Sequence, residues 1–265
     1  MIIQDDILKR NVMKLCEKIE NNFFNLVIIY GATRAGKSTL SMQMCQDMAE
    51  KLGVPFTVDN IFFGASELLD EMKKGKRKHI YQLDEAAFNL KGADWADEVQ
   101  KDLIKFIDTA AKYNQTLVII IPYIEELKYR FIRDIHTKTM EVTFNPFTYE
   151  RGYVKLYNHN HALKKYNLLK YKQFFQAGYI KNTPARFTAE TGNIDMAEYD
   201  RKKDAAIQAL GEKEEKGKAR MGDIFAGKLI NFISKEVAGW SKKRIAEEIL
   251  ETSDRNLTQF KKYAT

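Results

Sequence analysis

The sequence contains little cysteine and no long run of apolar residues. Cys16 and Cys45 are the only cysteines among its 265 residues, which excludes a disulfide scaffold and a four-thiolate zinc site. The longest apolar runs, residues 26–30 and 117–121, are far shorter than the roughly 20 residues that a transmembrane helix needs. Residues 1–20 carry charges throughout, unlike the apolar stretch of a signal peptide. We therefore expect a cytoplasmic protein with no membrane segment of its own, in which both thiols belong to the core.

Acidic residues are absent from one part of the chain. The formal net charge is +7, and the excess lies after residue 120, where 27 basic side chains stand against 19 acidic ones. Residues 151–189 contain no aspartate or glutamate and carry eight lysines and arginines. Such a block attracts polyanions, and nucleic acid is the first candidate.

Apolar periodicity divides residues 1–121 into alternating helices and strands. Asp5 caps a helix, and residues 23–30 form a strand too apolar to have a wet face, which is typical of a buried parallel strand. The other expected elements are helices over 39–52, 65–73 and 98–113 and strands over 56–58, 79–83 and 116–121. This alternation predicts an α/β fold with a mainly parallel sheet and helices on both faces.

The alternation weakens after Pro122. Two short strands are expected within residues 140–158, and residues 163–175 form either a basic helix or an irregular clamp. Residues 211–217 are a charged linker or a solvated helix. We expect four parts: a core over 1–150, a basic aromatic-rich extension over 151–190, a charged linker over 191–222 and a small helical domain over 223–265.

Residues 31–38 match the pattern G-x-x-x-x-G-K-[S/T] between a buried strand and a helix. In this setting the glycines let backbone amides turn inward around a phosphate, and the next helix N-terminus adds partial positive charge. We expect Lys37 to reach the β- and γ-phosphates, Ser38 to bind Mg²⁺ and Thr39 to contact the α-phosphate. The alternative is a glycine turn with an exposed lysine. The candidate nucleotide-binding residues are Gly31, Ala32, Thr33, Arg34, Ala35, Gly36, Lys37, Ser38 and Thr39.

Two adjacent carboxylates follow the strand expected over 79–83. Asp84 would support the metal, and Glu85 would orient and deprotonate an attacking water, as a hydrolase needs. The alternative is that both acids cap the next helix. The sequence has no Asn-Lys-x-Asp guanine reader, so ATP is favoured over GTP.

Several of these segments together resemble a known family. They are the phosphate loop, Asn60-Ile-Phe-Phe before a helix, Leu83-Asp84-Glu85-Ala86, the segment around Trp95, and residues 117–122 before an arginine-bearing stretch. The combination resembles the viral and plasmid branch of the FtsK/HerA-like P-loop ATPases, which includes zonula-occludens-toxin-like proteins and ATPases of DNA packaging or transfer. The resemblance covers roughly residues 23–145. It implies a P-loop ATPase core in residues 1–150 and, for a viral member, location in the host cytoplasm.

The resemblance also implies assembly into a ring with ATP between subunits. An arginine of the neighbouring subunit would then reach the γ-phosphate and stabilise charge on the transferring phosphoryl group. Arg130 and Arg133, after the last expected core strand, are the candidates. The alternative for each is a solvated or ion-paired surface arginine.

Two segments are candidates for contact with DNA. In the acid-free block, lysines and arginines alternate with aromatic residues. If these aromatic residues are exposed they would stack on unpaired nucleobases, and if they are buried they belong to the core. These aromatic residues are Tyr153, Tyr157, Tyr166, Tyr171, Phe174, Phe175 and Tyr179. Residues 223–265 carry three short amphipathic helices, which suit either a helix-turn-helix module or a helical oligomerisation or lid module.

The sequence therefore predicts a Mg²⁺-dependent ATPase acting on DNA, as a ring-forming translocation or packaging motor of a virus or mobile element. One alternative is an ATP-controlled DNA-binding regulator or partition factor that moves no strand. A second is a membrane-associated assembly or secretion ATPase, which would need a membrane-bound partner.

Overall fold

The computed structural model describes residues 1–84, 95–109, 113–134, 136–145 and 147–209. The chain divides into two compact units, Met1–Lys203 and Asp204–Thr265, and only residues 204–209 of the second unit are described. The expected helical domain over 223–265 and the charged segment 211–217 lie outside the described residues. The structure below is that of the first unit.

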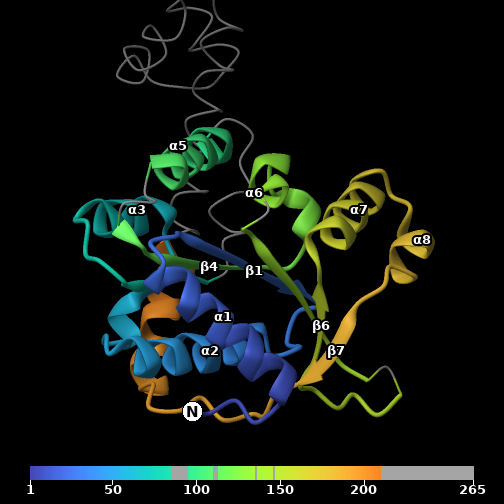
Figure 1. The fold of residues 1–265 in the computed structure, drawn as a ribbon, viewed down its shortest axis with the longest axis horizontal. Helices are drawn as coiled ribbons and strands as arrows, with labels where there is room; N and C mark the ends of the chain where they lie inside the picture. Colours follow the sequence, from blue (N-terminus) through green and yellow to red (C-terminus); the bar gives the residue numbers. More distant parts are fainter. Residues whose placement is uncertain (85–94, 110–112, 135, 146, 210–265) are drawn as a thin grey trace, which may run out of the picture. The chain divides into compact units, whose positions relative to one another are not determined.

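A seven-stranded sheet forms the centre of the first unit (Figure 1). Its order is β2-β3-β4-β1-β5-β6-β7, and the five strands from β2 to β5 pair in parallel, whereas β6 and β7 join antiparallel. The strands are β1 (Asn25–Gly31), β2 (Ile61–Phe62), β3 (Ile80–Leu83), β4 (Thr116–Ile121), β5 (Lys138–Thr143), β6 (Tyr153–Tyr157) and β7 (Thr183–Arg186). The predicted mainly parallel sheet is confirmed.

Helices cover both faces of the sheet because its central strands are buried on both sides. Alternate residues of β1 point to opposite faces: Ile28 packs under α3, α5, α6 and α7, and Ile29 packs under α1 and α2. Figure 1 shows the two helical layers on either side of the strands. The helices are α1 (Asp6–Glu20), α2 (Lys37–Leu52), α3 (Ala65–Lys73), α5 (Trp95–Thr109), α6 (Tyr129–Arg133), α7 (His159–Lys170) and α8 (Phe174–Gly178), with 3₁₀ turns η1 (Val58–Asn60) and η3 (Ile124–Glu126).

Local chemistry explains where several elements begin. The Asp5 carboxylate caps α1 by accepting from the amides of Ile7 and Leu8, as expected. The strand expected over 56–58 is wrong, because Thr57 caps η1 and forms a reciprocal capping pair with Asn60. The short strand of this region is β2 instead.

Residues 163–175 are mainly helical. The basic-helix alternative is confirmed for α7, whose N-cap Asn158 accepts from the amide of His161. Lys172 has φ 59°, which ends the helical path before α8 begins. Within the first unit, residues 196–203 form a further helix.

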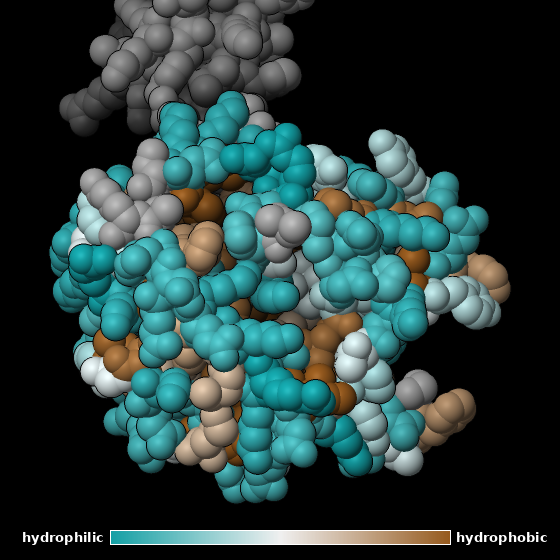
Figure 2. Space-filling model, in the orientation of Figure 1, coloured by the Kyte–Doolittle hydropathy of each residue, from teal (hydrophilic) through white to brown (hydrophobic). Residues whose placement is uncertain are grey.

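The surface is hydrophilic over most of the face shown in Figure 2, with apolar side chains in small groups. None of the helices in the described part of the chain has the length and apolar character that crossing a bilayer requires. Both cysteines are buried, free thiols, as expected, and burial raises the pKa of Cys16 to about 11 and that of Cys45 to about 12. At neutral pH both are therefore protonated and unreactive.

Candidate functional site

The phosphate loop occupies the turn between β1 and α2. Gly31 ends β1 at φ 135°, and a Cβ there would lie 2.0 Å from the backbone oxygen of Val142 on β5. Gly36, at φ 101°, is the N-cap of α2. Arg34 also has a positive φ, 63°. This backbone directs the loop around an open space and leaves the first amides of α2 without a side-chain cap, which suits an anion.

Lys37 lies at the first position of α2 and bends back over the loop. Its ammonium donates to the backbone oxygens of Gly31 and Ala32, each at 2.9 Å. Ser38 and Thr39 follow in the same helical turn. The lysine is therefore held at the mouth of the loop, within reach of a phosphate that displaces those carbonyl contacts.

Asp84 directly follows β3, at the same edge of the sheet as the phosphate loop. Its side chain is fully buried, and its Oδ2 accepts from the Tyr199 hydroxyl at 2.6 Å and from the Gln82 amide at 3.4 Å. Gln82 is itself fixed by the Ser41 hydroxyl of α2 at 2.8 Å. A hydrogen-bonded chain thus connects the carboxylate to the helix that starts at the phosphate loop.

The loop and Asp84 face one cavity of about 800 Å³. This volume lies within the roughly 300–1,000 Å³ of ligand sites. Of the residues predicted for nucleotide and metal, the lining includes Thr33, Arg34, Gly36, Lys37, Ser38, Thr39 and Asp84. Gly31 and Ala32 act through their backbone oxygens on Lys37, and Ala35 is buried in the core.

Other predicted residues do not line this cavity as far as it is described. Glu85 lies outside the described residues. Arg130 on α6 donates to Asp108 of α5 at 2.7 Å, and Arg133, on the same helix, is exposed. The structure therefore does not bring either arginine to the phosphate loop of its own chain.

Sequence reasoning missed a part of the cavity lining that comes from residues 187–203, hereafter the strap. Thr191, Met196, Tyr199 and Lys203 of the strap line the cavity. Arg151, in the loop before β6, also lines it. No local pattern marks the strap residues, because they reach the cavity only after the chain has passed through β5, β6 and β7.

The oxygen donors fit a magnesium ion that is shared with a nucleotide. Mg²⁺ prefers oxygen ligands, keeps several waters and usually takes one or two protein ligands together with phosphates. The Ser38 hydroxyl and the Asp84 carboxylate line the same cavity and supply that set. Within the described ranges no group of three or more His, Cys, Asp or Glu side chains forms a metal cluster, so a zinc-type cage is not the pattern here.

Comparisons with known proteins give weak likenesses only. No protein-family model matches the chain, and no curated protein matches it. One similar solved structure is a DNA replication initiation factor, with 16% identity, coverage of 96% of this chain and 83% of that chain, and a TM-score of 0.35. Another is the replication initiator DnaA bound to AMPPCP and single-stranded DNA, with 14% identity, coverage of 98% and 85%, and a TM-score of 0.36. Neither score supports an argument about function, and the FtsK/HerA-like resemblance stays a prediction.

Proposed function

We propose that this protein is a Mg²⁺-dependent ATPase that couples hydrolysis to the handling of DNA. The observation that supports the nucleotide chemistry is the shared cavity of about 800 Å³, which both the phosphate loop and Asp84 line. A chance glycine turn with a surface lysine would not place a buried carboxylate in the same cavity.

The residues have distinct roles in this proposal. Lys37 would leave the loop carbonyls and bind the β- and γ-phosphates, and the first backbone amides of α2 would also donate to the phosphates. Ser38 and Asp84 hold Mg²⁺, which neutralises charge on the phosphates when bound, and Thr39 contacts the α-phosphate. Glu85, next in the chain after Asp84, takes the proton of the attacking water.

The DNA contact is assigned to residues 170–181, hereafter the basic-aromatic surface. Of the seven aromatic residues considered for stacking, Tyr157 and Tyr166 are buried, so the core alternative holds for them. Four others are exposed by 59–78%: Tyr171, Phe174, Phe175 and Tyr179. The exposed residues Lys170, Lys172 and Lys181 flank them. Exposed aromatic faces with lysines and no acids suit an unpaired strand, whose bases stack while its phosphates are neutralised.

ATP turnover with and without DNA tests the proposed function. We expect single-stranded DNA to stimulate turnover, and Glu85→Gln to abolish most of it while ATP binding survives. ATP-dependent DNA binding with little turnover would favour the regulator or partition factor. Turnover that ignores DNA but responds to a protein partner would favour the assembly or secretion ATPase.

The basic-aromatic surface is tested by replacing Phe175 and Tyr179 with alanine. Stacking contributes roughly 1–3 kcal/mol per base, so the double variant should bind an oligonucleotide at least about tenfold more weakly. Tyr149→Ala is the control, because Tyr149 is equally exposed, at 75%, but lies in the loop before β6. Equal losses in the two variants would contradict the assignment.

Ring assembly is a further part of the proposal and is tested by particle size. We expect a larger particle with a non-hydrolysable ATP analogue and DNA than without them. If Arg130 or Arg133 acts on the neighbour's ATP, its alanine variant should lose turnover but keep nucleotide binding. A monomer under all conditions would exclude the ring.

A further inference from the structure

We propose that Tyr199 is a positioning residue for Asp84 and that the strap holds it there to prepare the metal site. The proposal rests on the function proposed above, because it assumes that Asp84 supports Mg²⁺. It adds a residue 115 positions away in the chain, which nothing in the sequence pattern connects with the site.

The contact between Tyr199 and Asp84 is short, and both residues are buried. The Tyr199 hydroxyl donates to Oδ2 of Asp84 at 2.6 Å, and the two residues are 4% and 0% exposed. Hydrogen bonds to a carboxylate are about twice as strong as neutral ones, and they strengthen further where water is excluded. The second donor, the Gln82 amide, reaches the same oxygen. Both contacts therefore fix the carboxylate through Oδ2, and Oδ1 takes part in neither.

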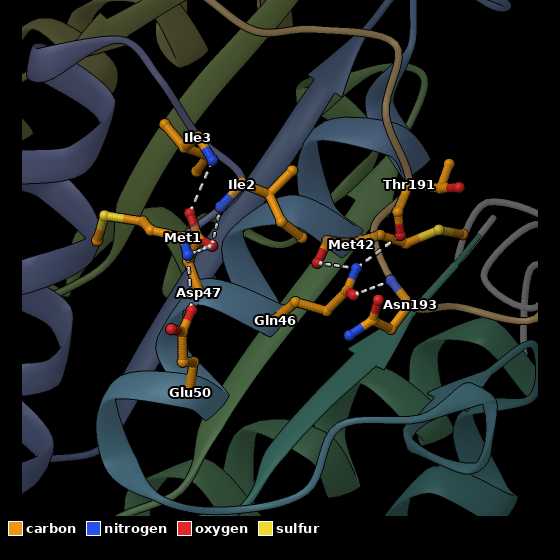
Figure 3. Close-up of polar contacts among 9 residues, drawn as sticks. All are labelled: Met1, Ile2, Ile3, Met42, Gln46, Asp47, Glu50, Thr191 and Asn193. Atoms are coloured by element: carbon orange, nitrogen blue, oxygen red, sulfur yellow. Dashed lines mark hydrogen bonds and ion pairs between the residues drawn. The ribbon is translucent and has the colours of Figure 1, made fainter.

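The strap is tied to α2, the helix that begins at the phosphate loop. The Gln43 amide donates to the backbone oxygens of Thr188 at 3.0 Å and Glu190 at 2.6 Å. Gln46 donates to the oxygen of Thr191 and accepts from the amide of Asn193, both at 2.7 Å. Figure 3 shows Gln46 between these two strap residues. The helix α2 therefore begins at the phosphate loop and also positions the strap.

Apolar packing fixes the tyrosine ring. Tyr199 belongs to a buried cluster with Met42 of α2 and with Val58, Ile61 and Ile194. The ring of Phe63 lies 5.6 Å from it. Beyond the ring, the Lys202 ammonium pairs with Asp59 at 2.8 Å. The hydroxyl is therefore presented to Asp84 by a packed element and does not depend on a mobile side chain.

The expected consequence is preorganisation of the metal carboxylate. A ligand that is already oriented loses less conformational freedom when the ion binds, and outer partners of metal ligands typically contribute 10–100-fold to metal affinity. Tyr199→Phe removes one oxygen and keeps the packed ring. This substitution should therefore weaken Mg²⁺ binding without changing how the loop binds phosphate.

The test measures binding of a non-hydrolysable ATP analogue to the full chain by calorimetry over a range of Mg²⁺ concentrations. In Tyr199→Phe the Mg²⁺ concentration for half-maximal enhancement of binding should rise about tenfold, while metal-free affinity changes less than twofold. Gln46→Ala, which loosens the strap outside the cavity, should shift it in the same direction. Tyr166→Phe is the matched control, because its buried hydroxyl donates to the Leu127 oxygen at 2.7 Å and lies in another part of the fold. That variant should match the wild type.

An unchanged Mg²⁺ requirement in a folded Tyr199→Phe protein would overturn the positioning role. A lower requirement would overturn it too, because the hydroxyl would then compete with the metal. Urea unfolding of both tyrosine variants shows that each is folded. Failure of the wild type to bind the analogue would reject the proposed function, and this proposal with it, whereas normal wild-type binding with an unshifted variant rejects only this proposal.

Discussion

Lys37 is the residue whose loss should most directly remove nucleotide binding. Its ammonium stands over the loop between two backbone oxygens and lines the cavity. A charge-assisted contact to phosphate contributes roughly 1.5–3 kcal/mol, so Lys37→Ala should weaken binding of the ATP analogue by about 10–100-fold. Lys51→Ala, in the last turn of the same helix, is the control and should bind normally. Calorimetry at one fixed Mg²⁺ concentration measures both.

Gly31 should tolerate no side chain. A Cβ at this position would lie 2.0 Å from the backbone oxygen of Val142, so β1 and β5 would have to separate. Gly31→Ala should cost about 3 kcal/mol or more of unfolding free energy, measured in urea. Gly53→Ala separates the steric effect from backbone strain, because Gly53 has φ 66° but a Cβ added there would meet no atom within 4 Å. It should cost about 1 kcal/mol. Equal losses would show that φ alone matters.

Single residues also show how far the sequence reached into the site. Most of the loop residues that the spacing pointed to line the cavity, because a strand, a tight turn and a helix place them by local geometry, but Ala35 is buried in the core. The position of Asp84 could be predicted from the sequence for a similar reason, since the carboxyl ends of parallel strands share one edge of a sheet. The contact of Tyr199 with Asp84 could not be predicted from the sequence, because it depends on the path of the whole strap.

At the scale of elements, a buried ion pair joins α7 to the sheet. The Lys165 ammonium contacts Glu141 of β5 at 2.5 Å and the Tyr157 hydroxyl of β6 at 2.7 Å. Glu141→Gln leaves the lysine, whose side chain is 6% exposed, without its counter-charge and should cost about 3 kcal/mol in urea unfolding. Adding Lys165→Met should restore most of the loss. Asp70→Asn, which breaks an exposed pair, should cost less than about 0.5 kcal/mol.

The same pair predicts how stability depends on pH. Burial works to raise the pKa of the Glu141 carboxyl, but the Lys165 ammonium, the Tyr157 hydroxyl and the Lys155 charge together outweigh it, so the pKa lies below its ordinary 4.5. A carboxyl with a lowered folded-state pKa stabilises the protein above its unfolded pKa and loses that contribution as pH falls through the folded value. Unfolding free energy should therefore decline below pH 4.5, and less steeply in Glu141→Gln. Parallel curves for the two proteins would contradict this account.

Elements were predictable where burial and periodicity agreed. The helix over 65–73 and the strand over 116–121 have the predicted bounds, because each carries its full apolar pattern locally. The strand over 56–58 failed because a side-chain cap at Thr57 overrides the apolar pattern. The antiparallel edge formed by β6 and β7 was not predicted, since strand pairing depends on contacts between distant segments.

At the scale of the whole molecule, nucleotide binding should need only the first unit. Every residue that lines the described cavity lies within Met1–Lys203. A chain ending after Leu210, one residue past the last described position, should therefore bind the ATP analogue with an affinity within about twofold of the full chain by calorimetry. A large loss would show that the second unit contributes to the site.

DNA binding by the same shortened chain distinguishes the two DNA candidates. Retained binding of a single-stranded oligonucleotide would support the basic-aromatic surface, and loss of duplex binding would support a helix-turn-helix module in residues 223–265. Full affinity for both forms would reject the module.

The position of the strap in the chain determines when, during synthesis, the lining of the cavity is complete. Chains grow from the N-terminus at roughly 5–20 residues per second, so the ribosome adds Tyr199 roughly eight to thirty seconds after Lys37. A nascent chain that already holds the glycine turn and most of the sheet still lacks the strap residues that line the cavity. Prematurely terminated products that stop before the strap would contain the phosphate loop without the strap residues that line the cavity. The chain therefore completes this cavity only late in its own synthesis.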